Sequence, residues 1–308
     1  MKELNNEYKT WLQTLGFAES SVKSLPMYTA EMLTWLKQQN ITGANQTCTE
    51  LSRSITAEAI KTFFFHWKNR KNKRTGAGLS QSHINQGALA INNFIRFLKL
   101  TGKNNISLKL EREESPLRIP QILTLPEIQS LYEATHNNTR RVNTTAYAQR
   151  DRAMLAVYYG CGLRRSEGNS LVLSDILTEK KLLYVRKGKG SKERFVPIAE
   201  KGMQDMEEYL QYGRKWFLQQ RQKPAQITSE YFFINLWGEP MKDFAARIRQ
   251  LREEAGIQKQ ITLHSFRHSI ATHLLQGGMD IEQIKKFLGH ASLESTQIYT
   301  HILNELSC

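Results

Sequence analysis

The sequence predicts a mainly α-helical protein of two domains, with one small antiparallel β-sheet in the second domain. Apolar residues in the first third recur at helical spacing, without strand-like alternation of any length. Residues 103–121 are polar and carry three glutamates and two prolines, a composition typical of an extended linker. Further along, two short apolar runs bracket a turn rich in glycine and lysine, as the strands of a hairpin do. We therefore expect a helical domain at residues 1–114 and a larger domain at residues 115–308.

The 308-residue chain has a formal net charge of +14, from 43 Lys and Arg against 29 Asp and Glu. Half of this charge lies in residues 1–114 and half in residues 115–308. Because both expected domains are basic, the charge favours a polyanionic partner such as nucleic acid, although cationic surfaces also serve solubility. Hydrophobic residues make up 40% of the chain, which excludes wholesale disorder and suffices for real cores.

The three cysteines, Cys48, Cys161 and Cys308, are widely spaced and form no CxxC pair. This pattern indicates a reduced protein with neither a disulfide framework nor a metal site. The first residues contain no apolar signal segment, and no later segment approaches the roughly 20 apolar residues that span a bilayer. We expect a cytoplasmic protein that binds no metal and no membrane.

Two helices of the first domain are marked by capping residues and by apolar spacing. Thr56 can cap the first helix, and Ser80 can cap the second, which ends before Gly102. The first helix has a single apolar stripe formed by Ile60, Phe63, Phe64 and Trp67. Both helices are expected to pack in the core of this domain.

A basic run separates these two helices. Residues 68–74 contain five cations in seven positions and lead into a flexible loop at residues 75–78. Cations of this kind suit DNA phosphates, which makes Lys71, Lys73 and Arg74 candidate DNA-binding residues. A solvated helix end, whose cations complement the negative end of the helix dipole, explains the run equally well.

The second domain opens with a capping box, formed by Thr124 and Glu127, at the start of a helix. Residues 182–185 and 195–198 are strand-like and bracket the turn at residues 187–192. These segments predict one strand, a lysine-rich turn and a second strand in sequence order.

Helical patterns resume at residues 241–255 and continue from residue 264 to the end. Gly289 is a natural stop for one of these helices, and Ser292 can cap the next, which carries Tyr299. A tyrosine on a short amphipathic helix is usually a core residue, so its position alone assigns it no chemistry.

Residues suited to phosphate lie in this last part of the chain. His264 and Arg267 are three residues apart, so on a helix they project from one face, where an imidazole and a guanidinium suit a pair of phosphate oxygens. His290 follows the helix that ends at Gly289. Taken singly, either histidine is explained as well by capping or packing.

Together the motifs resemble the tyrosine recombinase (phage integrase) family, and its Xer-type and simple integrase members in particular. The similar segments are CGLRRSE at residues 161–167, GKGSKER at 188–194, HSFRH at 264–268, and LGH at 288–290 followed after eight residues by Tyr299. They span nearly the whole second domain, whereas the first domain is similar only in being a small, basic, helical unit.

The resemblance implies a catalytic set of six residues: Arg164, Lys189, His264, Arg267, His290 and Tyr299. In that set the arginines hold the nonbridging oxygens of the scissile phosphate, the lysine is the general acid, and the tyrosine is the nucleophile. The histidines match the two histidine positions of the family. Lys192 competes with Lys189 for the general-acid role, because both lie in the same turn. Lys192 and Arg194 are also expected to contact DNA, and Glu167 to buttress the Arg164 segment.

The implied reaction is the cutting and rejoining of double-stranded DNA. A 3′-phosphotyrosine preserves the energy of the broken bond, so the exchange needs neither ATP nor metal. The absence of a Walker-type glycine loop and of a carboxylate cluster agrees with this interpretation. The resemblance further implies a two-domain clamp on the duplex, with the two domains on opposite faces, and a homotetramer that assembles across two DNA sites.

Two features depart from the family. Gly168-Asn169-Ser170 replaces the usual bulky apolar residues, and we expect it to weaken the helix and loosen the Arg164 region. Nine residues follow Tyr299, fewer than in relatives that dock a longer tail into a neighbour. Two other functions stay open: a type IB topoisomerase, which would relax supercoils without strand exchange, and a DNA-binding regulator that keeps the fold without catalysis.

Overall fold

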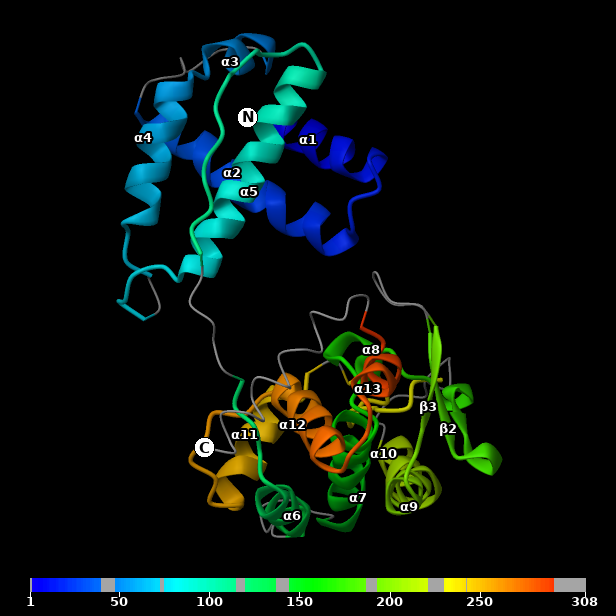
Figure 1. The fold of residues 1–308 in the computed structure, drawn as a ribbon. Helices are drawn as coiled ribbons and strands as arrows, with labels where there is room; N and C mark the ends of the chain where they lie inside the picture. The colour runs from blue at the N-terminus through cyan, green and yellow to red at the C-terminus, as the bar shows by residue number, and fades with distance from the viewer. Residues whose placement is uncertain are drawn as a thin grey trace. The chain divides into compact units, whose positions relative to one another are not determined.

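A computed structural model of the chain describes residues 2–39, 48–72, 75–114, 120–136, 144–186, 193–220, 230–241 and 243–290. The chain divides into two compact units, Met1–Arg118 and Ile119–Cys308 (Figure 1). The division falls within the stretch that the composition marks as a linker. None of the described helices is long and apolar enough to cross a membrane.

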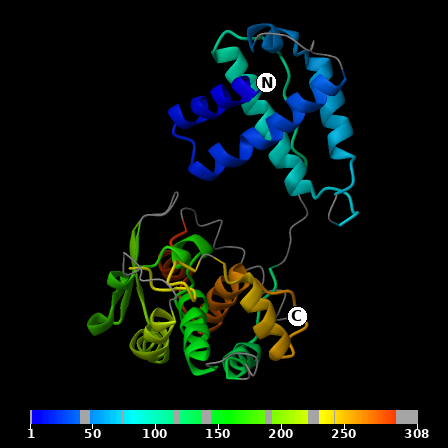
Figure 2. The same ribbon diagram turned by 180° about the vertical axis from the view of Figure 1, so that it is seen from behind.

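The first unit consists of α1 (Lys2–Thr14), α2 (Glu19–Gln38), α3 (Cys48–Ser54), α4 (Ala57–Lys68) and α5 (Gln81–Leu100). Helix α2 packs against α1, α4 and α5 (Figure 1, Figure 2). Both predicted caps are present, since Thr56 accepts a hydrogen bond from the amide of Ala59 and Ser80 accepts one from the amide of His83. The predicted apolar stripe of α4 is buried in the core of this unit.

The segment after α5 is extended, as its composition predicts, but its first part packs on the first unit. Asn92 donates to the carbonyl of Leu110 and accepts from its amide, both at 2.9 Å. Asn85 makes the same pair of bonds with Glu113, at 2.7 and 3.2 Å. Each asparagine therefore substitutes for a neighbouring strand, satisfying the donor and acceptor of one linker residue.

The helices of the second unit are α6 (Leu125–Ala134), α7 (Thr144–Leu155), α8 (Arg165–Asn169), α9 (Glu200–Glu208), α10 (Arg214–Gln219), α11 (Ala245–Glu254), α12 (Leu263–Gln276) and α13 (Ile281–Leu288). Two π-helical turns, η1 (Ala156–Gly160) and η4 (Tyr209–Gly213), extend α7 and α9, and η2 (Leu173–Asp175) and η3 (Thr178–Lys180) are 3₁₀ turns. The capping box of α6 is confirmed, because Thr124 and Glu127 bond each other's backbone amides.

The small sheet contains three described antiparallel strands in the order β1 (Ile176–Leu177), β2 (Leu182–Val185) and β3 (Arg194–Pro197). β3 begins one residue earlier than its apolar run predicts, and β1 is an addition to the predicted hairpin. Leu183 pairs with Val196, and both side chains are fully buried against the main core. Their neighbours Tyr184 and Phe195 pair across the two strands, with ring centroids 5.1 Å apart and the rings tilted by 32°.

The core of the second unit surrounds the end of α7 and η1. Met154, Leu155, Val157 and Tyr158 are fully buried, and this segment contacts α9 and α12. The π-helical turn closes with a bond from the amide of Cys161 to the carbonyl of Ala156, at 2.9 Å. The chain then leaves the core after Leu163, which directly precedes the first motif arginine.

Candidate active site

Arg164 stands immediately before α8 and is fixed by the first turn of that helix. Its backbone amide donates to Oε2 of Glu167 at 2.9 Å, and its Nη1 donates to Oε1 of the same carboxylate at 2.8 Å. The local spacing explains this, because a carboxylate three residues into a helix reaches back to the residue that precedes it. The Arg164 side chain remains 28% exposed, so part of the guanidinium faces outward.

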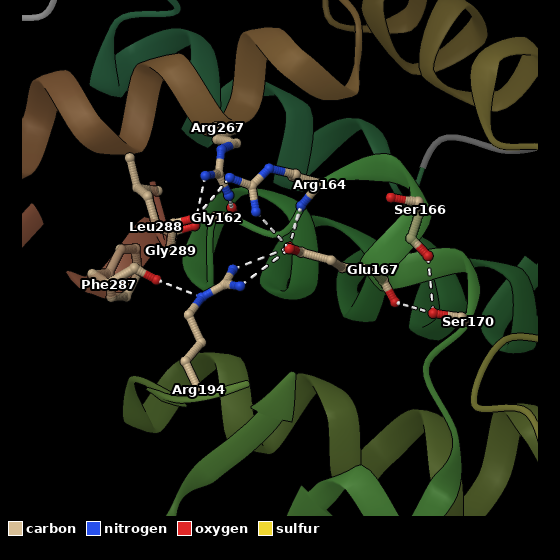
Figure 3. Close-up of polar contacts among 10 residues, drawn as sticks. All are labelled: Gly162, Arg164, Ser166, Glu167, Ser170, Arg194, Arg267, Phe287, Leu288 and Gly289. Carbon is tan, nitrogen blue, oxygen red and sulfur yellow. Dashed lines mark hydrogen bonds and ion pairs between the residues drawn. The ribbon is translucent and has the colours of Figure 1, made fainter. Parts of the chain in front are cut away.

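Glu167 is also held from β3 by Arg194 (Figure 3). Nη1 of Arg194 donates to Oε1 at 3.1 Å and Nη2 donates to Oε2 at 3.0 Å, a bidentate pair. Burial alone would raise the pKa of Glu167. The hydrogen bonds and charge of Arg194, followed by the bonds from Arg164, outweigh burial and lower that pKa to about 2. The carboxylate is therefore ionised at neutral pH.

Arg267 on α12 is buried, with only 3% of its surface exposed. Its Nη1 donates to the carbonyl of Gly162 and its Nη2 to the carbonyl of Leu288, both at 2.6 Å. Arg267 therefore joins the segment that precedes Arg164 to the end of α13.

The C-terminal end of α13 receives three arginines from three different parts of the unit. The carbonyl of Phe287 accepts from Nε of Arg194 at 3.0 Å, and the carbonyl of Gly289 accepts from Nη2 of Arg164 at 2.8 Å. Between them, the carbonyl of Leu288 accepts from Arg267 (Figure 3). The last carbonyls of a helix lack partners within the helix and carry its negative dipole end, so guanidiniums satisfy them well. This arrangement brings Arg164 and Arg267 to one place.

Gly289 is required at this end of α13 for two reasons. Its backbone is left-handed, with φ +65°, and a Cβ at this position would lie 2.8 Å from Nη1 of Arg194. Gly162 has the same need, because φ is +60° and an added Cβ would lie 2.9 Å from Cδ2 of Leu288. The glycines of two motifs thus allow the backbone to approach the arginines and α13 closely.

The two predicted histidines lie within the electrostatic field of these arginines. Burial, followed by the charges of Arg267 and Arg164, lowers the pKa of His264 below its ordinary value and that of His290 to about 3. Both imidazoles are therefore neutral near pH 7 in the protein without DNA.

The sequence interpretation did not identify a third histidine, His268. Burial, followed by the charges of His264 and Arg267, lowers its pKa to about 4, and its own charge contributes to the lowered pKa of His290. The spacing of His264 and His268, four residues apart on α12, was a sequence signal that the two share a face.

The geometry corrects the expectation that Arg194 contacts DNA. Its side chain is only 8% exposed and all three of its guanidinium nitrogens bond Glu167 or the end of α13. A guanidinium so enclosed is placed to position its neighbours, because little of its side chain is exposed to a phosphate in solvent.

A second correction concerns Gly168 and Asn169, which were expected to loosen the Arg164 region. A Cβ on Gly168 would lie 2.5 Å from the ring of Tyr158, and the hydroxyl of Tyr158 donates to Oδ1 of Asn169 at 2.7 Å. The glycine makes room for a buried tyrosine, and the asparagine satisfies its hydroxyl. This departure from the family pattern is therefore a packed contact that supports α8.

Other predicted site residues are placed only in part. Lys71 is exposed, and its backbone forms an isolated antiparallel β-bridge with Gly78. Lys73, Arg74, Lys189, Lys192 and Tyr299 lie outside the described residues. Within the ranges that are described, no group of three or more His, Cys, Asp or Glu residues could hold a metal ion.

Comparison with known proteins shows the family. Residues 121–305 match the phage integrase family. Tyrosine recombinase XerD of Halalkalibacterium halodurans is 31% identical over 256 residues, covering 82% of this chain and 79% of that protein. Tyrosine recombinase XerD of Chlorobaculum tepidum is 36% identical over 229 residues, covering 73% and 72%.

A solved structure of similar fold is the XerH site-specific recombinase bound to difH substrate in a pre-cleavage complex. It superposes with a TM-score of 0.65 at 20% identity, covering 92% of this chain and 77% of that one. At this identity the likeness is one of fold. The sequence matches and the arginine site lead to one conclusion: this chain belongs to the phage integrase family of tyrosine recombinases.

Proposed function

We propose that the protein is a site-specific DNA recombinase that cuts and rejoins DNA strands through a 3′-phosphotyrosyl intermediate. The observation that carries the proposal is the meeting of Arg164 and Arg267 at the end of α13, beside His290. Family membership supports it, since the relatives are named tyrosine recombinases and one neighbouring structure is a recombinase bound to its difH substrate.

The arginines supply the electrostatic part of the reaction. Attack on a phosphodiester places additional negative charge on the nonbridging oxygens, so fixed cations in a partly dry site stabilise the transition state more than the ground state. Arg164 and Arg267 are the two residues we assign to these oxygens. Their bonds to backbone carbonyls hold them in place before DNA binds.

Tyr299 is the proposed nucleophile. Its phenolic oxygen attacks phosphorus, the bond from phosphorus to the 5′ oxygen breaks, and the phenol proton passes to a neutral imidazole, for which we propose His264 or His290. Both imidazoles are unprotonated at neutral pH before DNA binds, and the negative charge of a bound phosphate would raise their pKa toward that of an effective base. Religation to a second 5′ hydroxyl reverses the same steps.

The leaving 5′ oxygen requires a proton, which we assign to Lys189 with Lys192 as the competing candidate. A substrate with sulfur in place of the bridging 5′ oxygen separates the two. A thiolate leaves without being protonated, because the pKa of a thiol is about 8.5. We expect Lys189→Ala to cleave this sulfur substrate again. The cleavage rate of Lys192→Ala should be the same on the sulfur and the oxygen substrates. The opposite pattern would move the role to Lys192.

We further propose that residues 1–114 form a DNA-binding domain and residues 115–308 the catalytic domain of a clamp. Lys71, Lys73 and Arg74 of the first domain and Lys192 of the second would contact phosphates. Exchange between two duplexes needs one active tyrosine for each strand, which supports a homotetramer on two DNA sites. Because the substrate is cellular DNA, we propose a cytoplasmic location and a reaction without a cofactor.

The experiment maps where purified protein cleaves the genomic DNA that flanks its own gene. We expect a covalent adduct on a defined sequence in the wild type, resistant to denaturation and joined to the 3′ end. Tyr299→Phe should bind the same DNA without forming the adduct. An adduct that persists in Tyr299→Phe would refute the nucleophile, and cleavage without sequence preference would refute site specificity.

A further inference from the structure

The buried pair of Arg194 and Glu167 is the feature that the reaction, as described so far, does not use. Arg194 approaches from β3, whereas Glu167 lies on the first turn of α8 and also bonds Arg164. The Glu167 carboxylate is 4% exposed and therefore receives little screening from water. A buried negative charge so close to Arg164 would oppose the binding of a phosphate unless a further cation balanced it.

We propose that Arg194 is a positioning residue for DNA cleavage, which neutralises Glu167 and holds the end of α13 so that Arg164 and Arg267 keep their full charge for the scissile phosphate. The proposal rests on the proposed function. Arg194 itself does not reach the phosphate, because its side chain is 8% exposed and its guanidinium already faces Glu167 and the carbonyl of Phe287.

The charge balance of the cluster gives the first argument. Three guanidiniums and one carboxylate, those of Arg164, Arg194, Arg267 and Glu167, leave two net positive charges. Removing Arg194 would leave one, and Arg164 would then be the guanidinium that remains bonded to Glu167. Arg164 would then act mainly as the counter-ion of a buried carboxylate, since an unpaired buried charge is strongly unfavourable.

The path of the Arg194 side chain gives the second argument. It crosses α13 at Gly289, where a Cβ would lie within 3.0 Å of Cδ and Cζ of Arg194. From there Nε reaches the carbonyl of Phe287 and the two Nη atoms reach Glu167. A single side chain thus links β3 to the first turn of α8 and to the end of α13, which directly precedes His290. A lysine could not make these three bonds together.

The test measures the rate of adduct formation on a nicked duplex that carries the mapped cleavage site, with Arg194→Gln, Arg194→Lys and the double variant Arg194→Gln/Glu167→Gln. Because Arg194→Gln leaves the cluster with one positive charge fewer than the wild type, we expect adduct formation to slow on the order of 100-fold, the loss typical of weakening one electrostatic contact to a transition state. Because the double variant restores two net positive charges, we expect it to cleave within about tenfold of the wild type. Arg194→Lys keeps the charge and should lie between Arg194→Gln and the wild type.

Arg247→Gln is the matched control, because Arg247 forms a similarly buried pair with Asp151, at 2.6 Å, away from α13. We expect this variant to melt at a lower temperature than the wild type and, below that temperature, to cleave DNA at nearly the wild-type rate. The comparison separates loss of a buried ion pair from loss of this particular one.

The outcomes are distinct. A folded double variant that is as slow as Arg194→Gln would overturn the role of charge balance, and wild-type rates in Arg194→Gln would overturn the inference altogether. If Arg194→Gln does not fold, the double variant and Arg194→Lys still decide, because both are expected to be active. A wild-type protein that forms no adduct would instead refute the proposed function.

Discussion

Replacing Gly289 with alanine tests how tightly the end of α13 and the arginines are built together. The backbone at this position has φ +65°, and the new Cβ would lie 2.8 Å from Nη1 and 3.0 Å from Cζ of Arg194. A left-handed alanine costs about 1–2 kcal/mol. Complete displacement of a buried guanidinium from its carboxylate costs about 3–5 kcal/mol. The new Cβ would displace Arg194 only partly, so its cost is a fraction of this value. We expect a total loss of about 2–4 kcal/mol in the free energy of unfolding of the second unit.

Gly256→Ala is the control for the backbone contribution alone. Gly256 follows α11 with φ +69°, and nothing lies within 4 Å of a Cβ added there. We expect this variant to lose only about 1–2 kcal/mol and to cleave DNA normally. Urea unfolding gives the stability difference, and adduct formation on the nicked duplex gives the functional one. Equal destabilisation and equal cleavage by the two variants would refute the contact between Gly289 and Arg194.

Three further predictions follow from the same site. Glu167 has its folded pKa lowered from 4.5 to about 2, so its contribution to stability is present above pH 4.5 and is lost as the pH falls toward 2. In urea titrations, the wild type should lose about 2 kcal/mol between pH 7 and pH 3 that Glu167→Gln does not lose. With the pKa of His290 lowered to about 3 and that of His264 also lowered, the adduct rate on subsaturating DNA should stay flat from pH 7.5 to 6.5, and a loss centred near 6.5 would contradict neutral imidazoles. Lys71→Gln should weaken DNA binding and reduce the slope of log affinity against log salt by about 1, with no change in adduct rate at saturating DNA, and an unchanged slope would remove Lys71 from the interface.

Local sequence signals predicted the local structure well. The caps at Thr56, Ser80 and Thr124 lie where their spacing placed them, because each depends on residues within one helical turn. The hairpin strands follow from short apolar runs beside a turn signal, with β3 displaced by one residue. The third strand, β1, is only two residues long and has too little pattern to be recognised.

The arrangement of the site depends on contacts that the sequence does not encode locally. Arg194 bonds the carbonyl of Phe287 across 93 residues, and Arg164 bonds that of Gly289 across 125 residues. A cation beside a lysine-rich turn is normally exposed, so only the tertiary structure reveals that Arg194 is enclosed. Gly168 is a similar case, because helix propensity treats it as a weakness whereas the packed ring of Tyr158 requires it.

The capping of α13 by arginines has a consequence for the entropy of DNA binding. A free arginine side chain samples many rotamers and loses about 2 kcal/mol of conformational freedom when it is fixed. Arg164 and Arg267 have already lost that freedom, because backbone carbonyls hold them in the protein without DNA. The entropy cost of fixing these two side chains arises during folding, so it does not weaken the binding of DNA. The end of α13 thus acts as a template on which the two arginines proposed to bind phosphate are assembled in advance.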